Sequence, residues 1–244
     1  TLLMEWFESW FDTPFYHMLY SDRNDSEAQR FMDRLANYLE VSDNMSVLDV
    51  ACGRGRHAIY LNEKGYNVTG IDLSEESISV ANKSANERLR FFVRDMRNPL
   101  KYKYDLVLNL FTSFGYFETE EENKLSLLNL ANALNPGGRL VIDFLNSKKA
   151  ANALINQETK TVEGIDFRIH RSFENGFFLK RIEFEHEGEE HAYSEKVKAL
   201  TLIDFHDGLE AAGLKILNTF GDYDLNDFDA QHSERLILIA HKVN

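Results

Sequence analysis

The feature that most constrains this sequence is a regular alternation, from Ser46 onward, between short apolar segments and segments with helical periodicity. The apolar segments are rich in β-branched residues and too short for helices. They lie at residues 46–51, 67–71, 89–93, 104–110 and 138–145. Strands that alternate with helices in this way form a parallel sheet with helices on both faces. The sequence therefore predicts an α/β chain with a doubly wound sheet.

Local signals mark the ends of the helices between these strands. Ser74 before Glu75 is typical of a helix N-cap, and Thr119 with Glu122 forms a predicted capping box. The run Asn135-Pro136-Gly137-Gly138 predicts the end of the helix before the fifth strand. N-terminal helices are also expected, because apolar residues recur at helical spacing there. These residues are Trp6, Phe7, Trp10, Phe11, Ala28, Phe31, Met32, Leu35 and Leu39.

After Asn146 the apolar residues recur at every second position, which predicts antiparallel strands around the tight-turn pair Asn175-Gly176. A helix is expected again from Thr201, followed by two closing strands at 214–220 and 235–241. We expect one domain in three parts, of which the core is built from two segments. The parts are an N-terminal helical cap (1–40), a core (46–146 and 201–244) and a small inserted antiparallel sheet (150–200).

A glycine-rich turn follows the first predicted strand. Gly53 and Gly55 lack a Cβ and let a ligand approach the backbone where a helix begins. The run Gly53-Arg54-Gly55-Arg56-His57-Ala58 also satisfies the dinucleotide pattern G-x-G-x-x-G/A. The second strand ends at Asp72, whose carboxylate can accept hydrogen bonds from ribose hydroxyls. These residues alone leave NAD and S-adenosylmethionine open as cofactors.

Asp49, which precedes the glycines, distinguishes the two cofactors. A carboxylate at this position would repel a pyrophosphate and suits a zwitterionic cofactor with a sulfonium group. In addition, five segments in order resemble the motifs of class I S-adenosylmethionine-dependent methyltransferases: 48–55, 70–74, 94–97, 104–109 and 134–140. The resemblance implies a Rossmann-like, seven-stranded sheet with an antiparallel last strand.

The resemblance also implies a set of cofactor-binding residues. Gly53 and Gly55 would lie along the methionine part, Asp72 would hold the ribose, and Asp95 with Met96 would contact the adenine. Ala51 stands where many members have glycine, and its methyl group is tolerated if the backbone angles are ordinary. The full set is Asp49, Ala51, Gly53, Gly55, Asp72, Leu73, Asp95, Met96, Asn109 and Leu110.

The segment from Phe111 to Tyr116, the inserted sheet and the N-terminal helices loosely resemble those of sugar N,N-dimethyltransferases. The resemblance implies that the cap and the inserted sheet cover the site of a small-molecule acceptor. No catalytic signature is obligatory, because methyl transfer from a sulfonium depends mainly on positioning. If the acceptor nitrogen or oxygen must lose a proton, the candidate bases are Tyr116, Tyr16, Tyr20 and His17.

Composition narrows the partners. The net charge of -13 argues against a nucleic-acid surface, which needs clustered Lys and Arg. The single cysteine, Cys52, forms no internal disulfide and suggests a reducing, cytoplasmic compartment. No apolar run is long enough to span a bilayer, and the histidines show no metal-ligand spacing, so neither a membrane nor a metal is expected. The oligomeric state is open.

Two other functions remain as alternatives. A methyltransferase-like protein that binds the cofactor without catalysis has the same motifs, because the acceptor pocket has no fixed signature. An NAD-dependent oxidoreductase is less favoured, because it leaves Asp49 and the Asn135–Gly138 turn unexplained and no hydride-transfer domain is recognisable.

Overall fold

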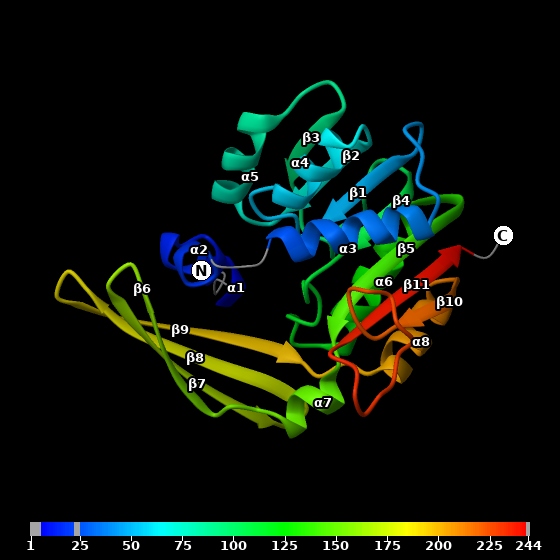
Figure 1. Ribbon diagram of the computed structural model, residues 1–244. Helices are drawn as coiled ribbons and strands as arrows, with labels where there is room; N and C mark the ends of the chain where they lie inside the picture. The colour runs from blue at the N-terminus through cyan, green and yellow to red at the C-terminus, as the bar shows by residue number, and fades with distance from the viewer. Residues whose placement is uncertain (1–5, 22–24, 243–244) are drawn as a thin grey trace.

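A computed structural model describes residues 6–21 and 25–242 of the chain. Its centre is a seven-stranded sheet in the order β10-β11-β5-β4-β1-β2-β3 (Figure 1). The strands are β1 (Ser46–Val50), β2 (Asn67–Asp72), β3 (Leu89–Val93), β4 (Tyr104–Asn109), β5 (Leu134–Leu145), β10 (Leu214–Phe220) and β11 (Arg235–Lys242). β1 to β5 pair in parallel, and β11 runs antiparallel to both of its neighbours. The predicted Rossmann-like sheet with an antiparallel last strand is confirmed.

Helices cover both faces of this sheet, because successive side chains of a strand point to opposite faces. Val47 packs with α3 (Asp25–Tyr38), α4 (Arg56–Glu63) and α5 (Glu75–Ala81), which a short 3₁₀ turn (Asn82–Ser84) follows. The neighbouring Leu48 packs on the other face with α6 (Glu120–Asn132) and α8 (Leu202–Ala211). The predicted caps at Ser74 and Thr119 are confirmed, and the helix expected from Thr201 is present. Thr119 and Thr201 each form a full capping box.

The expected start of the fifth strand at residue 138 is wrong. β5 begins at Leu134, which pairs with Tyr104, while the next paired residue of β4, Leu106, faces Arg139. Residues 135–138 therefore bulge out of the ladder. The turn residues predicted there are present, but they interrupt the strand instead of preceding it.

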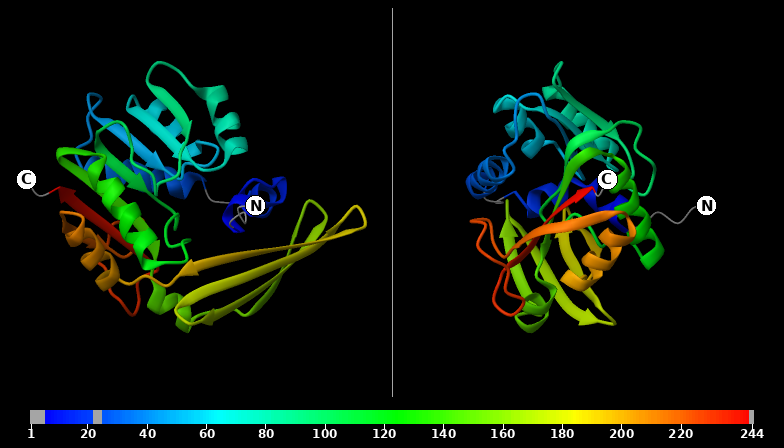
Figure 2. Two further views of the ribbon diagram at one scale, coloured as in Figure 1. Left: turned by 180° about the vertical axis from the view of Figure 1, so that it is seen from behind. Right: turned by 90° about the vertical axis from the view of Figure 1, so that its right-hand side faces the viewer.

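The inserted segment forms a separate antiparallel sheet in the order β6-β7-β8-β9, which projects from the core (Figure 2). Its strands are β6 (Gln157–Val162), β7 (Ile165–Glu174), β8 (Phe177–His186) and β9 (Glu189–Lys198), and α7 (Ser147–Asn152) precedes them. The two N-terminal helices α1 (Trp6–Phe11) and α2 (Pro14–Leu19) pack on this sheet through Trp10 and Leu19. None of the described helices is long and apolar enough to cross a bilayer.

Candidate active site

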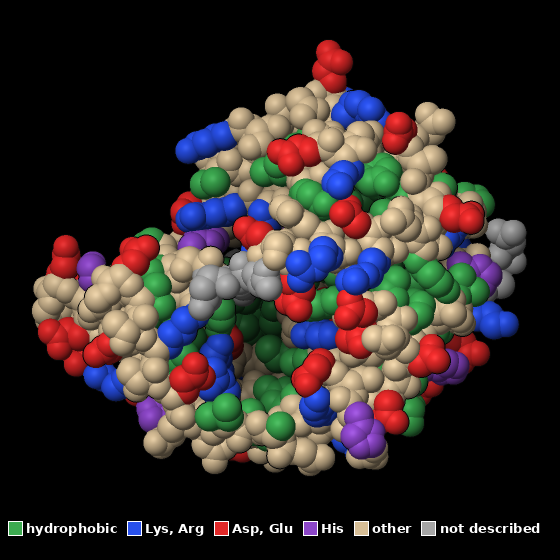
Figure 3. Space-filling model, viewed as in Figure 1, with side chains coloured by type: hydrophobic (Ala, Val, Ile, Leu, Met, Phe, Trp, Pro, Cys, Tyr) green, Lys and Arg blue, Asp and Glu red, His purple; other side chains and the backbone are tan. Residues whose placement is uncertain are grey.

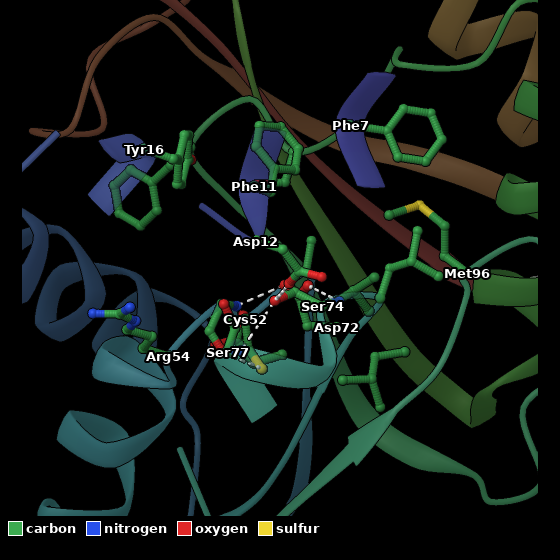
Figure 4. A pocket seen from close by; sticks show the side chains of 18 of the residues that line it. Phe7, Phe11, Asp12, Tyr16, Cys52, Arg54, Asp72, Ser74, Ser77 and Met96 are labelled. Carbon is green, nitrogen blue, oxygen red and sulfur yellow. Dashed lines mark hydrogen bonds between the residues drawn. The ribbon is translucent and has the colours of Figure 1, made fainter. Parts of the chain in front are cut away.

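A cavity of about 700 Å³ lies between the α1–α2 cap and the carboxyl ends of the core strands. Its floor comes from the segments that follow β1, β2, β3 and β4, which is where open α/β sheets bind ligands. Phe7, Phe11 and Tyr16 of the cap face Asp72 and Ser74 of the core across it (Figure 4). Seen from outside, the molecule is hollowed between the four-stranded sheet and the core, and hydrophobic side chains line the hollow (Figure 3).

The turn after β1 has a left-handed backbone at three positions: Ala51 (φ 60°), Gly53 (φ 55°) and Gly55 (φ 79°). The condition under which the Ala51 methyl group is tolerated, ordinary backbone angles, is therefore not met, and the methyl group is held in a conformation that favours glycine. At Gly55 a Cβ would lie 2.6 Å from Cε1 of Phe91, so close packing also requires glycine there. Cys52, between Ala51 and Gly53, is a buried free thiol.

The same turn orients Asp72. The backbone N–H of Gly53 donates to Oδ2 of Asp72 at 2.7 Å, and that of Ser74 donates to Oδ1 at 2.9 Å. Burial raises the pKa of Asp72, and these two backbone hydrogen bonds act in the opposite direction. The carboxylate lines the cavity in a fixed orientation, which suits hydrogen-bond donors on a ligand.

Asp49 lines the same cavity with only 4% of its surface exposed. Among the described residues, no group forms a hydrogen bond with its Oδ2 atom. Burial, and then the charge of Asp72, raises the pKa of Asp49 from 3.8 to about 7. A buried carboxylate without a cation is costly, so this site fits a positively charged ligand.

Asp95 is held by a residue outside the predicted set. Arg97 donates from Nη2 and Nε to Oδ2 of Asp95, at 2.8 and 3.0 Å, and from Nη1 to Oε1 of Glu122 at 2.9 Å. Its guanidinium lies 4.7 Å from the ring centroid of Phe117 and 5.8 Å from that of Phe7. Arg97 thus joins the cofactor segment, α6, the loop after β4 and the cap. Its sequence signal is its place at the end of the motif-like segment 94–97, two residues after Asp95.

Of the predicted cofactor residues, eight line the cavity and two do not. Those that line it are Asp49, Ala51, Gly53, Asp72, Leu73, Asp95, Met96 and Leu110. Gly55 and Asn109 are not among its lining residues. The fully buried side chain of Asn109 donates to the carbonyl oxygens of Ser113 (3.1 Å) and Val50 (3.4 Å), so its visible contacts shape the turn after β4.

All four candidate bases line the cavity: Tyr16, His17, Tyr20 and Tyr116. The hydroxyl of Tyr116 donates to the carbonyl oxygen of Thr112 at 2.5 Å. That of Tyr20 donates to Oε1 of Glu195 at 2.6 Å and accepts from Nζ of Lys180, so it ties the cap to β8 and β9.

The loop after β4 is fixed by a buried ion pair that the sequence does not reveal. Phe111 and Thr112 both have left-handed backbones, with φ of 60° and 58°. The N–H of Phe111 donates to Oδ2 of the fully buried Asp143 at 2.8 Å. Arg235 donates from Nε to Oδ1 of Asp143 at 2.8 Å and from Nη2 to Oγ1 of Thr112 at 2.9 Å. This network positions Phe111, which lines the cavity.

Comparison with known proteins gives a match to the methyltransferase domain family over residues 47–138. The chain is 34% identical over 100 residues to the dTDP-3-amino-3,4,6-trideoxy-alpha-D-glucopyranose N,N-dimethyltransferase of Streptomyces venezuelae, which covers 40% of this chain and 41% of that protein. It is 33% identical over 117 residues to the glycine N-methyltransferase of Rattus norvegicus, covering 41% of this chain and 40% of that protein. Such matches span about half or less of the length of the curated relatives.

Solved structures share the fold over nearly the whole chain. An S-adenosylmethionine-dependent methyltransferase from Clostridium acetobutylicum superposes with a TM-score of 0.78 at 20% identity, covering 94% of this chain and 96% of that one. DesVI of Streptomyces venezuelae superposes with a TM-score of 0.70 at 21% identity, covering 93% and 97%. Residues 47–138 therefore match the methyltransferase domain family, and the chain as a whole shares the fold of solved S-adenosylmethionine-dependent methyltransferases.

Proposed function

We propose that this protein transfers a methyl group from S-adenosylmethionine to a nitrogen or oxygen atom of a small-molecule acceptor by in-line displacement. The observation that carries the proposal is that the floor and the ceiling belong to the same cavity. Family-matched residues form its floor, and aromatic residues of the cap form its ceiling. Donor and acceptor would share this space, and positioning of this kind supplies much of the rate enhancement in group transfer.

The residues present fit the cofactor. S-adenosylmethionine supplies an activated methyl group on a positively charged sulfonium. Asp49, buried and without a hydrogen bond to Oδ2 from any described residue, would be compensated by a cationic ligand. Asp72, held by two backbone N–H groups, would accept hydrogen bonds from ribose hydroxyls. Leu73, Met96 and Leu110 offer apolar contacts for an adenine ring.

The acceptor side would be built by the cap, the loop after β4 and the inserted sheet. Phe7, Phe11, Tyr16 and Tyr116 line it, and rings that exclude water strengthen the electrostatic interactions inside. The proton of the Tyr116 hydroxyl is directed to Thr112, so its oxygen can accept a hydrogen bond from an acceptor N–H or O–H. That bond would turn the nucleophilic lone pair of the acceptor toward the floor.

Calorimetric titration with S-adenosylmethionine, S-adenosylhomocysteine and NAD tests the cofactor. We expect the first two to bind, Asp72→Asn to weaken both, and Asp207→Asn, on the exposed surface of α8, to leave them unchanged. Binding of NAD alone would refute the proposal. Mass-spectrometric detection of methyl transfer to a panel of amines, phenols and carboxylates then tests catalysis. Cofactor binding without transfer to any of them would favour the non-catalytic alternative.

A further inference from the structure

The lining of the cavity includes an acidic side chain from the α1–α2 part of the cap, outside the family-matched residues 47–138. Asp12 lies in the connection between α1 and α2, and its side chain lines the cavity beside the floor (Figure 4). The hydroxyl of Ser74 donates a hydrogen bond to Oδ1 of Asp12. Ser74 follows Asp72 by two residues and caps α5, because its Oγ accepts from the N–H of Ser77 at 3.0 Å. Asp12 therefore reaches the loop that holds Asp72.

The two carboxylates come close enough to interact, since the charge of Asp12 contributes to the raised pKa of Asp72. Two carboxylates that face one cavity repel each other unless hydrogen-bond donors or a cation lie between them. Arg54 and Arg56, which also line the cavity, form ion pairs with Glu76 and Asp25 instead. A ligand that places two hydroxyl donors between Asp12 and Asp72 would satisfy both groups.

An independent observation points to a ligand at this place. Asp49, on the neighbouring strand and also lining the cavity, is buried and has an Oδ2 atom to which none of the described residues donates. A ligand with a vicinal diol would satisfy Asp12 and Asp72, and a positive charge on the same ligand would compensate Asp49. A nucleoside sulfonium such as S-adenosylmethionine has both features.

We propose that Asp12 is a second ribose-binding carboxylate, which accepts a hydrogen bond from one hydroxyl of the cofactor's vicinal diol while Asp72 accepts from the other. The inference rests on the proposed function, because it requires this cofactor. It assigns the cap a direct role in cofactor binding as well as in covering the acceptor. The Ser74 hydroxyl orients the carboxylate of Asp12, and Ser74 is therefore a positioning residue.

Calorimetry with S-adenosylhomocysteine and its 2′-deoxy and 3′-deoxy analogues tests the inference in wild type, Asp12→Asn and the charge-matched surface control Asp207→Asn. In wild type and in the control, loss of the hydroxyl that contacts Asp12 is expected to weaken binding at least about tenfold. In Asp12→Asn the same deletion is expected to change affinity less than about threefold, because the charged acceptor is gone. Comparing the effect of the hydroxyl deletion in wild type and in Asp12→Asn separates the hydrogen bond between Asp12 and the hydroxyl from the repulsion between Asp12 and Asp72, which the substitution removes for every ligand.

Hydrogen–deuterium exchange gives a second readout that does not depend on activity. S-adenosylhomocysteine is expected to slow exchange in α1 and α2 of wild type and of Asp207→Asn, and to do so much less in Asp12→Asn. Suppose that wild type binds S-adenosylhomocysteine, but that each deoxy analogue binds more weakly than S-adenosylhomocysteine by the same factor in wild type and in Asp12→Asn. The role of Asp12 is then overturned, and the proposed function stands. If wild type does not bind S-adenosylhomocysteine, the proposed function itself fails.

Discussion

The buried carboxyl of Asp49 makes a strong prediction about how the stability of the ligand-free protein depends on pH. Its pKa rises from 3.8 to about 7 on folding, with burial as the largest cause and Asp72 as the second. Between pH 3.8 and pH 7, Asp49 is therefore protonated in the folded state and ionised in the unfolded state. The resulting stabilisation is complete below pH 3.8 and is lost as the pH rises through 7.

Proton linkage gives the magnitude. With these two pKa values, protonation of Asp49 stabilises the fold by about 2.7 kcal/mol at pH 5 and by less than about 0.1 kcal/mol at pH 8. For a chain of this size, that difference corresponds to a fall in melting temperature of about 5–10 °C. Asp72, whose pKa is also raised, adds to the fall in the same direction, and the thiol of Cys52 titrates at higher pH.

The variant Asp49→Asn isolates this effect, because an amide does not titrate. Urea unfolding of both proteins at half-unit intervals between pH 5 and pH 8 should show a smaller loss of stability in the variant, by about 2–3 kcal/mol over the range. Parallel curves for the two proteins would refute the assignment. If a cationic cofactor compensates Asp49, binding of S-adenosylmethionine at pH 6 should also release about 0.9 protons, measurable from calorimetry in buffers of different ionisation enthalpy.

Three further substitutions test the packing that shapes the cavity, each by urea unfolding at pH 7. Ala51→Gly should stabilise the fold by about 0.5–1 kcal/mol, because relief of the left-handed strain exceeds the added entropy of the unfolded chain; a loss of stability would contradict the strain. Gly70→Ala should destabilise by about 1–3 kcal/mol, since its Cβ would lie 2.6 Å from Cδ1 of Phe91; an unchanged midpoint would show that the ring moves freely. Arg235→Met should cost about 3–5 kcal/mol by leaving Asp143 buried without its cation, and adding Asp143→Asn should recover part of that loss; no recovery would point to lost packing instead.

The core could be predicted from the sequence because its signals are local. A strand that is buried on both faces has a short run of apolar residues in its sequence. The capping boxes at Thr119 and Thr201 depend only on two residues that lie three positions apart. β6 gives no such signal, because its side chains, from Gln157 to Val162, are almost all polar and it lies at the sheet edge. Glu163 and Gly164, which connect β6 to β7, have positive φ angles, as Asn175 and Gly176 do in the next turn. The pair Glu163-Gly164 is therefore the local sequence feature that marks the end of β6.

The site divides in the same way. Asp49 and Asp72 lie near the carboxyl ends of β1 and β2, and Asp95 follows β3. A sequence motif marks each of these positions, and all three residues line the cavity. Asp143 and Arg235 are 92 positions apart in the sequence and meet only because β11 pairs with β5. Antiparallel register decides such a contact, and no spacing rule along the chain encodes it.

Two of the contacts between the ceiling and the floor of the cavity reach residues of the proposed cofactor site. Asp12 accepts from Ser74 beside Asp72, and Phe7 lies against Arg97, which holds Asp95. A ligand that binds Asp72 and Asp95 and stabilises these contacts also stabilises the position of the cap. The coupling free energy is the same in both directions, because coupling between two sites is reciprocal. The cap also carries Phe11 and Tyr16, which line the same cavity and would form part of the proposed acceptor side. On the proposed function, cofactor binding and assembly of the acceptor pocket would therefore be linked, and the acceptor should bind more tightly to the cofactor-loaded protein than to the free protein.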